Sequence, residues 1–161
     1  MHGLSIVLFA ALVAGCGGRS AADYQSDARA ALDAGDRAKA IQLADEGLAQ
    51  DAVKQDVVAA WRLEQIRLDA LAGGGKGADV KKELERLAVA YPKQVNASLY
   101  RALADRVKTA GDVPGAIEIL AAGDQRFPAE HASFAEAIGG LKNGAPLDPA
   151  QVQRLKALGY L

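Results

Sequence analysis

The chain has 161 residues, a net charge of −1 and a single cysteine. This length suits one domain with a core of its own, and the charge balance excludes a protein that binds nucleic acid through a concentrated basic face. Half of the residues are hydrophobic, but only 5% are aromatic. Because apolar content of this kind, mainly Ala, Leu, Val and Ile, suits close-packed helices better than sheets, the composition predicts an all-α protein.

The chain begins with an apolar run, residues 4–15, that ends directly before Cys16. This run is too short to cross a bilayer as a helix, which needs roughly 20 apolar residues. It has the length of the hydrophobic part of a secretory signal, and the small pair before the cysteine is typical of a cleavage site. We therefore expect residues 1–15 to be a cleaved signal peptide, and residues 16–22 to be the new N-terminus and a short linker.

The junction Val13-Ala14-Gly15-Cys16 resembles the lipobox of bacterial lipoproteins. The resemblance implies that the Cys16 thiol is diacylated, that the chain is cut before it and that the new amino group is acylated. Several acyl chains hold a protein on a bilayer more firmly than one chain does. In this family Gly17 after the cysteine implies the periplasmic face of the outer membrane. The alternative is an unmodified cysteine buried in an N-terminal helix, which the glycines that follow would break.

Beyond the linker, apolar residues recur with helical spacing, and no stretch shows the sustained alternation of a strand. Gly35-Asp36 and Gly111-Asp112 each combine a glycine suited to ending a helix with an Asp suited to capping the next one. Asp148 before Pro149 predicts a further helix start. The predicted helices form antiparallel pairs and span residues 22–34, 37–50, 55–72, 78–91, 96–110, 113–126, 130–142 and 149–158.

Two parts of the chain repeat one pattern. Residues 35–41 match residues 111–117 at Gly, Asp, Ala and Ile, and aromatic-proline pairs end at Pro92 and Pro128. This helix-turn-helix repeat resembles tetratricopeptide (TPR) arrays, whose unit has about 34 residues. The resemblance implies a right-handed solenoid of three helical hairpins over residues 23–128. The third unit matches the motif best, at Tyr100, Leu103, Ala104, Gly111, Ala116, Leu120 and Pro128.

The C-terminal segment, residues 129–161, is expected to cap this stack. Phe134, Ile138 and Leu141 are spaced as on one face of a helix, and Val152 and Leu155 continue that pattern in the last predicted helix. Each hairpin of a solenoid has an apolar face that only a neighbour can cover. We therefore expect these helices to seal the open end.

A TPR array uses the first helix of each hairpin to line a groove that binds a peptide or protein segment. The family's groove positions correspond here to Gln25, Arg29, Arg62, Gln65, Asp69, Arg101, Asp105 and Lys108. Half of these side chains are basic, so the resemblance implies a partner with an acidic segment or a free C-terminus. The alternative is that they are ordinary solvated side chains, with Asp69 and Asp105 pairing with basic neighbours along the groove.

No motif for catalysis, a cofactor or a metal ion is found in the sequence. The stretch Gly73-Gly74-Gly75-Lys76-Gly77 lacks the spacing and the Ser or Thr of a phosphate-binding loop. His131 would be the one histidine left after cleavage, and it has no evident nucleophile beside it. The sequence therefore predicts a non-enzymatic, lipid-anchored adaptor in an envelope assembly. A cell-envelope enzyme or accessory subunit with an unrecognised site is the alternative.

Overall fold

The computed structural model describes residues 19–144 and 147–161; the predicted signal peptide and Cys16 lie outside these residues. The described residues form nine α-helices and one 3₁₀ helix and contain no strand, which confirms the all-α prediction. None of these helices combines the length and apolar character needed to cross a bilayer. The elements are α1 (Ala21–Asp33), α2 (Arg37–Leu48), α3 (Asp51–Gln55), α4 (Val57–Gly73), α5 (Gly77–Ala90), α6 (Ala97–Thr109), α7 (Val113–Arg126), η1 (Pro128–Glu130), α8 (His131–Gly144) and α9 (Pro149–Ala157).

The predicted helix boundaries at the two Gly-Asp pairs are present. Gly35 and Gly111 have φ values of 82° and 97°, the left-handed region that glycine adopts without strain. The carboxylates of Asp36 and Asp112 then accept the backbone N–H of Lys39 and Gly115, which begins α2 and α7. The short helix α3 was not predicted, and it forms where Val53, 1% exposed, reaches the core.

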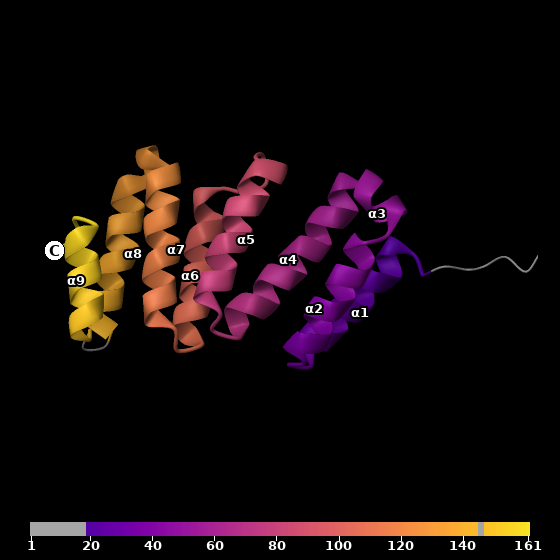
Figure 1. Ribbon diagram of the computed structural model, residues 1–161, viewed down its shortest axis with the longest axis horizontal. Helices are drawn as coiled ribbons and strands as arrows, with labels where there is room; N and C mark the ends of the chain where they lie inside the picture. Colours follow the sequence, from indigo (N-terminus) through magenta and orange to yellow (C-terminus); the bar gives the residue numbers. More distant parts are fainter. Residues whose placement is uncertain (1–18, 145–146) are drawn as a thin grey trace, which may run out of the picture.

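The helices lie side by side in chain order, with α1 near one end of the molecule and α9 at the other (Figure 1). α1 packs closely on α2, and α6 packs closely on α7. α4 packs mainly against α2 and α1 and less against α5, and Figure 1 shows α4 tilted away from α5. The middle predicted pair, α4 and α5, is therefore more open than the pairs on either side.

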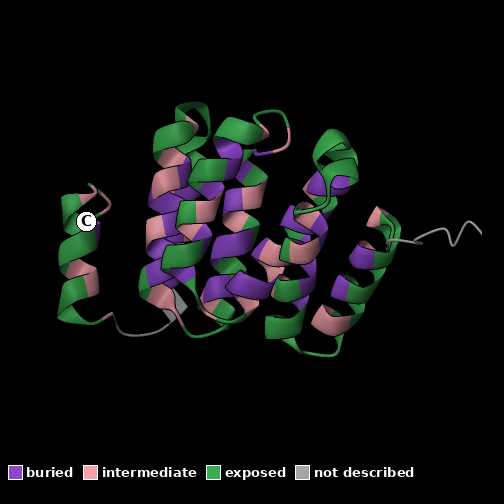
Figure 2. Ribbon diagram, turned by 45° about the vertical axis from the view of Figure 1, so that its right-hand side comes forward, coloured by how far each residue is buried: buried purple, intermediate pink, exposed green. Residues whose placement is uncertain are grey.

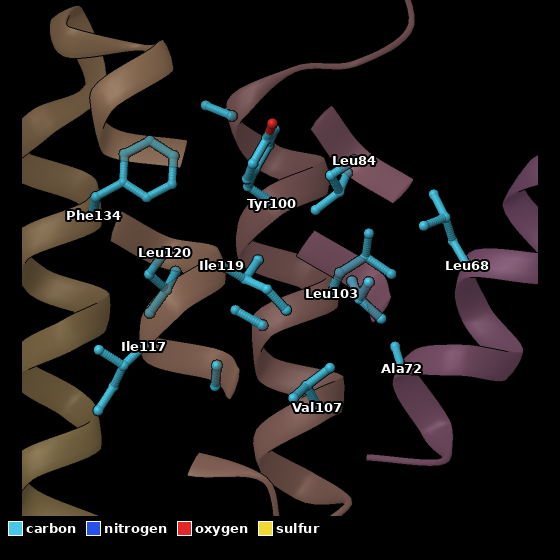
Figure 3. Packing of buried hydrophobic residues seen from close by; sticks show 14 of the residues in the cluster. Leu68, Ala72, Leu84, Tyr100, Leu103, Val107, Ile117, Ile119, Leu120 and Phe134 are labelled. Atoms are coloured by element: carbon cyan, nitrogen blue, oxygen red, sulfur yellow. The ribbon is translucent and has the colours of Figure 1, made fainter. Parts of the chain in front are cut away.

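The core follows the inner faces of the helices, and exposed residues cover their outer faces (Figure 2). One cluster extends from α4 to α9 and contains Tyr100, Leu103, Ile119 and Phe134, shown in Figure 3. Two smaller clusters fill the space between α1, α2 and α4. Leu155 of α9 is fully buried against the large cluster, so α9 is part of the packed structure.

Candidate functional site

The eight predicted groove residues lie on three neighbouring helices. α4 contacts both α1 and α6, and none of the eight residues is buried. We call this surface the α1–α4–α6 face; it carries Gln25 and Arg29 on α1, Arg62, Gln65 and Asp69 on α4, and Arg101, Asp105 and Lys108 on α6. The predicted set therefore consists of solvent-accessible side chains on adjacent helices.

Asp69 links the three helices of this face. One carboxylate oxygen lies 3.7 Å from Nη1 of Arg29, and the other pairs with Nη1 of Arg106. Both arginines remain about half exposed, at 47% and 49% of their side-chain surface. They line a hollow of about 420 Å³ that also contains Arg37. Asp69 thus pairs with a basic neighbour along the face, as one of the two sequence-based interpretations expected.

A second hollow lies further along the same face, between α6 and α8. Arg101, Asp105 and Lys108 line it from α6, and residues of α7 and α8, among them Leu120 and Leu141, complete a space of about 130 Å³. The Arg101 guanidinium lies 5.5 Å from the centre of the Phe134 ring and 3.7 Å from a Glu130 oxygen. These contacts hold the Arg101 side chain at the edge of the hollow.

The remaining three predicted residues have different roles. The Gln25 amide donates a hydrogen bond of 3.3 Å to the Ala59 carbonyl, so it ties α1 to the beginning of α4. Arg62 and Gln65 are exposed on α4 and line neither of the two hollows. Their side chains face solvent, where a partner can reach them.

Sequence reasoning missed Arg37 and Arg106. Arg106 follows Asp105 directly, but it turns toward Asp69 on α4, which a motif position does not reveal. Arg37 begins α2, a second helix of a hairpin, and the family's groove positions lie on first helices. Helices α1, α4 and α6 together carry as many acidic as basic residues, so no charge pattern in the sequence points to either arginine.

A network of charged side chains joins α2, α4 and α5 away from these hollows. Glu64 is only 4% exposed, and its Oε1 accepts a hydrogen bond of 2.6 Å from Arg86. Arg67 pairs with Asp45 at 2.9 Å and with Glu83 at 2.7 Å. Glu83 retains only 14% of its side-chain exposure, so these charges are not simply solvated.

The network determines the charge state of Glu83. Burial alone raises the pKa of this carboxyl, but hydrogen bonds from Arg67 and Arg86 outweigh that effect and hold the pKa below its ordinary value. The Trp61 and Tyr91 rings lie 5.4 Å apart and also connect α4 with the end of α5. These contacts bridge the open middle pair of helices, so the network stabilises the fold.

His131 takes part in a cluster at the C-terminal end. Its Nδ1 lies 2.9 Å from an Asp124 oxygen, and the Tyr160 hydroxyl donates a hydrogen bond to the same carboxylate. The His131 and Tyr160 rings are stacked at 6.3 Å, and burial together with Asp124 raises the pKa of Tyr160. The cluster fixes the end of the chain to α7.

Neither a metal-binding cluster nor a similarity to known proteins adds a functional assignment for this chain. In the described part of the chain, no group of three or more His, Cys, Asp or Glu is placed to hold a metal ion. Comparison with known protein families, with curated proteins and with solved structures finds no match to this chain. The two hollows are therefore the features of this chain that bear on its function.

Proposed function

We propose that this protein is a lipid-anchored adaptor of the bacterial cell envelope. In this proposal acyl chains on Cys16 hold the protein at the periplasmic face of the outer membrane, and its helices form a TPR-like right-handed solenoid capped by residues 129–161. The α1–α4–α6 face binds a protein or peptide partner. Tethering to a surface raises the effective concentration of such a partner.

The observation that carries the binding proposal is the arrangement around Asp69. Arg29 and Arg106 both pair with this one carboxylate from opposite neighbouring helices, and both keep about half of their surface exposed. Guanidinium groups can bind a second carboxylate through two parallel hydrogen bonds. A carboxylate presented by a partner can therefore share these arginines with Asp69.

The charge of the face favours an acidic partner. Together with the charged residues that line the hollow around Asp69, it carries six basic side chains against three acidic ones: Arg29, Arg37, Arg62, Arg101, Arg106 and Lys108 against Asp33, Asp69 and Asp105. Complementary charge raises the association rate and selects the partner, and exposed charges of this kind act mainly in that way. The proposed partner segment is thus an acidic stretch or a free C-terminus.

Crosslinking of the intact lipoprotein in its native envelope tests the proposal. Arg62→Glu and Arg101→Glu each reverse a charge on the face, and both are expected to abolish partner capture. Arg62 forms no hydrogen bond or ion pair with the described residues, so Arg62→Glu is also expected to preserve helicity and thermal unfolding, whereas Arg101→Glu also loses the contacts with Glu130 and Phe134. Lys82→Glu is the matched control, because it makes the same charge change on the exposed side of α5. Capture that survives the two arginine substitutions contradicts a basic binding face.

A further inference from the structure

A separate pocket lies between α5, α7 and α9, and it contains none of the residues of the α1–α4–α6 face. It has a volume of about 340 Å³, within the range of small-molecule sites. Ala121, Ala122 and Leu158 form its apolar floor. Charged and polar side chains surround this floor, so the pocket combines an apolar surface with a polar rim.

Tyr100 reaches this pocket from α6. The residue is 1% exposed, and its ring packs edge-on against Phe127 at 5.8 Å. Figure 3 shows its oxygen on the side away from Leu103 and Val107. The hydroxyl forms no hydrogen bond with any residue that the structure describes. The hydroxyl is not one of the buried polar atoms that lack a partner in the described residues, so it opens onto the pocket, where a ligand can replace solvent as its hydrogen-bond partner.

The charges on the rim fall into two groups. Glu118 is saturated, since Lys81 lies 3.3 Å and Arg154 Nη2 lies 2.7 Å from its Oε2. Arg126 and Glu85 keep unused hydrogen-bonding groups. Arg126 donates one hydrogen bond, from Nη2 to the Ala88 carbonyl at 2.9 Å, and its other N–H groups remain available to a ligand. Glu85 is exposed and forms no hydrogen bond or ion pair within residues 19–144 and 147–161.

We propose that this pocket binds a small aliphatic α-amino acid. The ligand's carboxylate accepts hydrogen bonds from Arg126 and from the Tyr100 hydroxyl, and its ammonium group pairs with Glu85. Its side chain rests on the apolar floor. A simple anion would satisfy Arg126 and leave Glu85 unpaired, whereas a zwitterion satisfies both. This proposal is independent of the lipid anchor and of the α1–α4–α6 face.

Titration calorimetry of the full-length protein in detergent tests the proposal with three probes. L-leucine carries both charged groups, N-acetyl-L-leucine lacks the ammonium group, and L-leucinamide lacks the carboxylate. L-leucine is expected to bind saturably and each analogue to bind roughly tenfold or more weakly, because each leaves one polar group of the site unpaired. Absence of saturable L-leucine binding, or equal binding of the three probes, overturns the proposal.

Substitutions then assign the binding to this pocket. Glu85→Gln removes an exposed charge that supports no contact of the fold, so it is expected to weaken L-leucine binding roughly tenfold with unchanged thermal unfolding. Tyr100→Phe removes only the hydroxyl and is expected to weaken binding as well. Lys82→Gln, on the same helix but outside the pocket, is the control and binds L-leucine as the unmodified protein does. Unchanged affinity in Glu85→Gln and Tyr100→Phe overturns the assignment.

Discussion

Asp112 caps two helices at once, and its removal gives a sharp test of how the repeats are joined. Its Oδ1 accepts the Gly115 N–H at 2.8 Å at the start of α7, and its Oδ2 accepts the Gly77 N–H at 2.9 Å at the start of α5. The backbones of Gly77 and Gly115 approach so closely that a Cβ on Gly77 would lie 2.5 Å from the Gly115 Cα. The starts of α5 and α7 therefore meet at this one carboxylate.

Asp112→Ala is therefore expected to cost more than an ordinary cap. Losing a helix N-cap costs about 1 kcal/mol, and leaving the buried Gly77 N–H unpaired adds about 1–3 kcal/mol, which gives roughly 2–4 kcal/mol. Asp36→Ala is the matched control, because Asp36 follows a glycine in the same way but caps only α2, through Lys39. It is expected to cost about 1 kcal/mol.

Urea unfolding of both variants, followed by circular dichroism, measures the two free energies of unfolding. The double cap predicts that Asp112→Ala loses at least twice as much stability as Asp36→Ala. Equal losses in the two variants would refute the argument that one carboxylate joins α5 to α7.

Further predictions concern acid stability and helix contacts. Ion pairs with arginines and a lysine lower the pKa values of Glu83 and Glu118 in the folded protein. The stability that these two carboxylates contribute is therefore complete above the ordinary value of 4.5 and is lost as the pH falls through the lowered values. Glu83→Gln should reduce this acid dependence of the free energy of unfolding. Gly123→Ala places a Cβ 2.6 Å from Phe134 and should destabilise by about 1–3 kcal/mol, whereas Gly140→Ala meets open space and should stabilise by roughly 0.5–1 kcal/mol. Thermal unfolding that ranks these two variants in the opposite order would contradict the packing of α7 on α8.

The helices were predictable because their signals are local. Gly35-Asp36 and Gly111-Asp112 specify a helix end and a helix start within a few residues, and the structure has both. The second bond of Asp112, to Gly77, joins residues far apart in the sequence, so no local pattern contains it. The tilt of α4 away from α5 is likewise a result of packing between helices.

The candidate site was predictable only in part for the same reason. Motif positions identified exposed residues on α1, α4 and α6, but the pairing of Arg106 with Asp69 depends on how two helices are rotated against each other. Glu64 looks in the sequence like any helical carboxylate, and only the fold shows that it is buried beside Arg86. The pocket beside Tyr100 is formed by residues of α5, α6, α7 and the end of α9, which come together only in the folded chain.

The modification of Cys16 is the central claim, because it places the binding face at a membrane. Mass spectrometry of the protein purified from its native envelope tests this claim most directly. The account predicts a chain that begins at Cys16 and carries acyl groups on the sulfur and on the amino group, and it predicts that Cys16→Ala accumulates as an uncleaved precursor without fatty-acid label. A free amino terminus with an unmodified Cys16, or a native chain that retains residues 1–15, would contradict it.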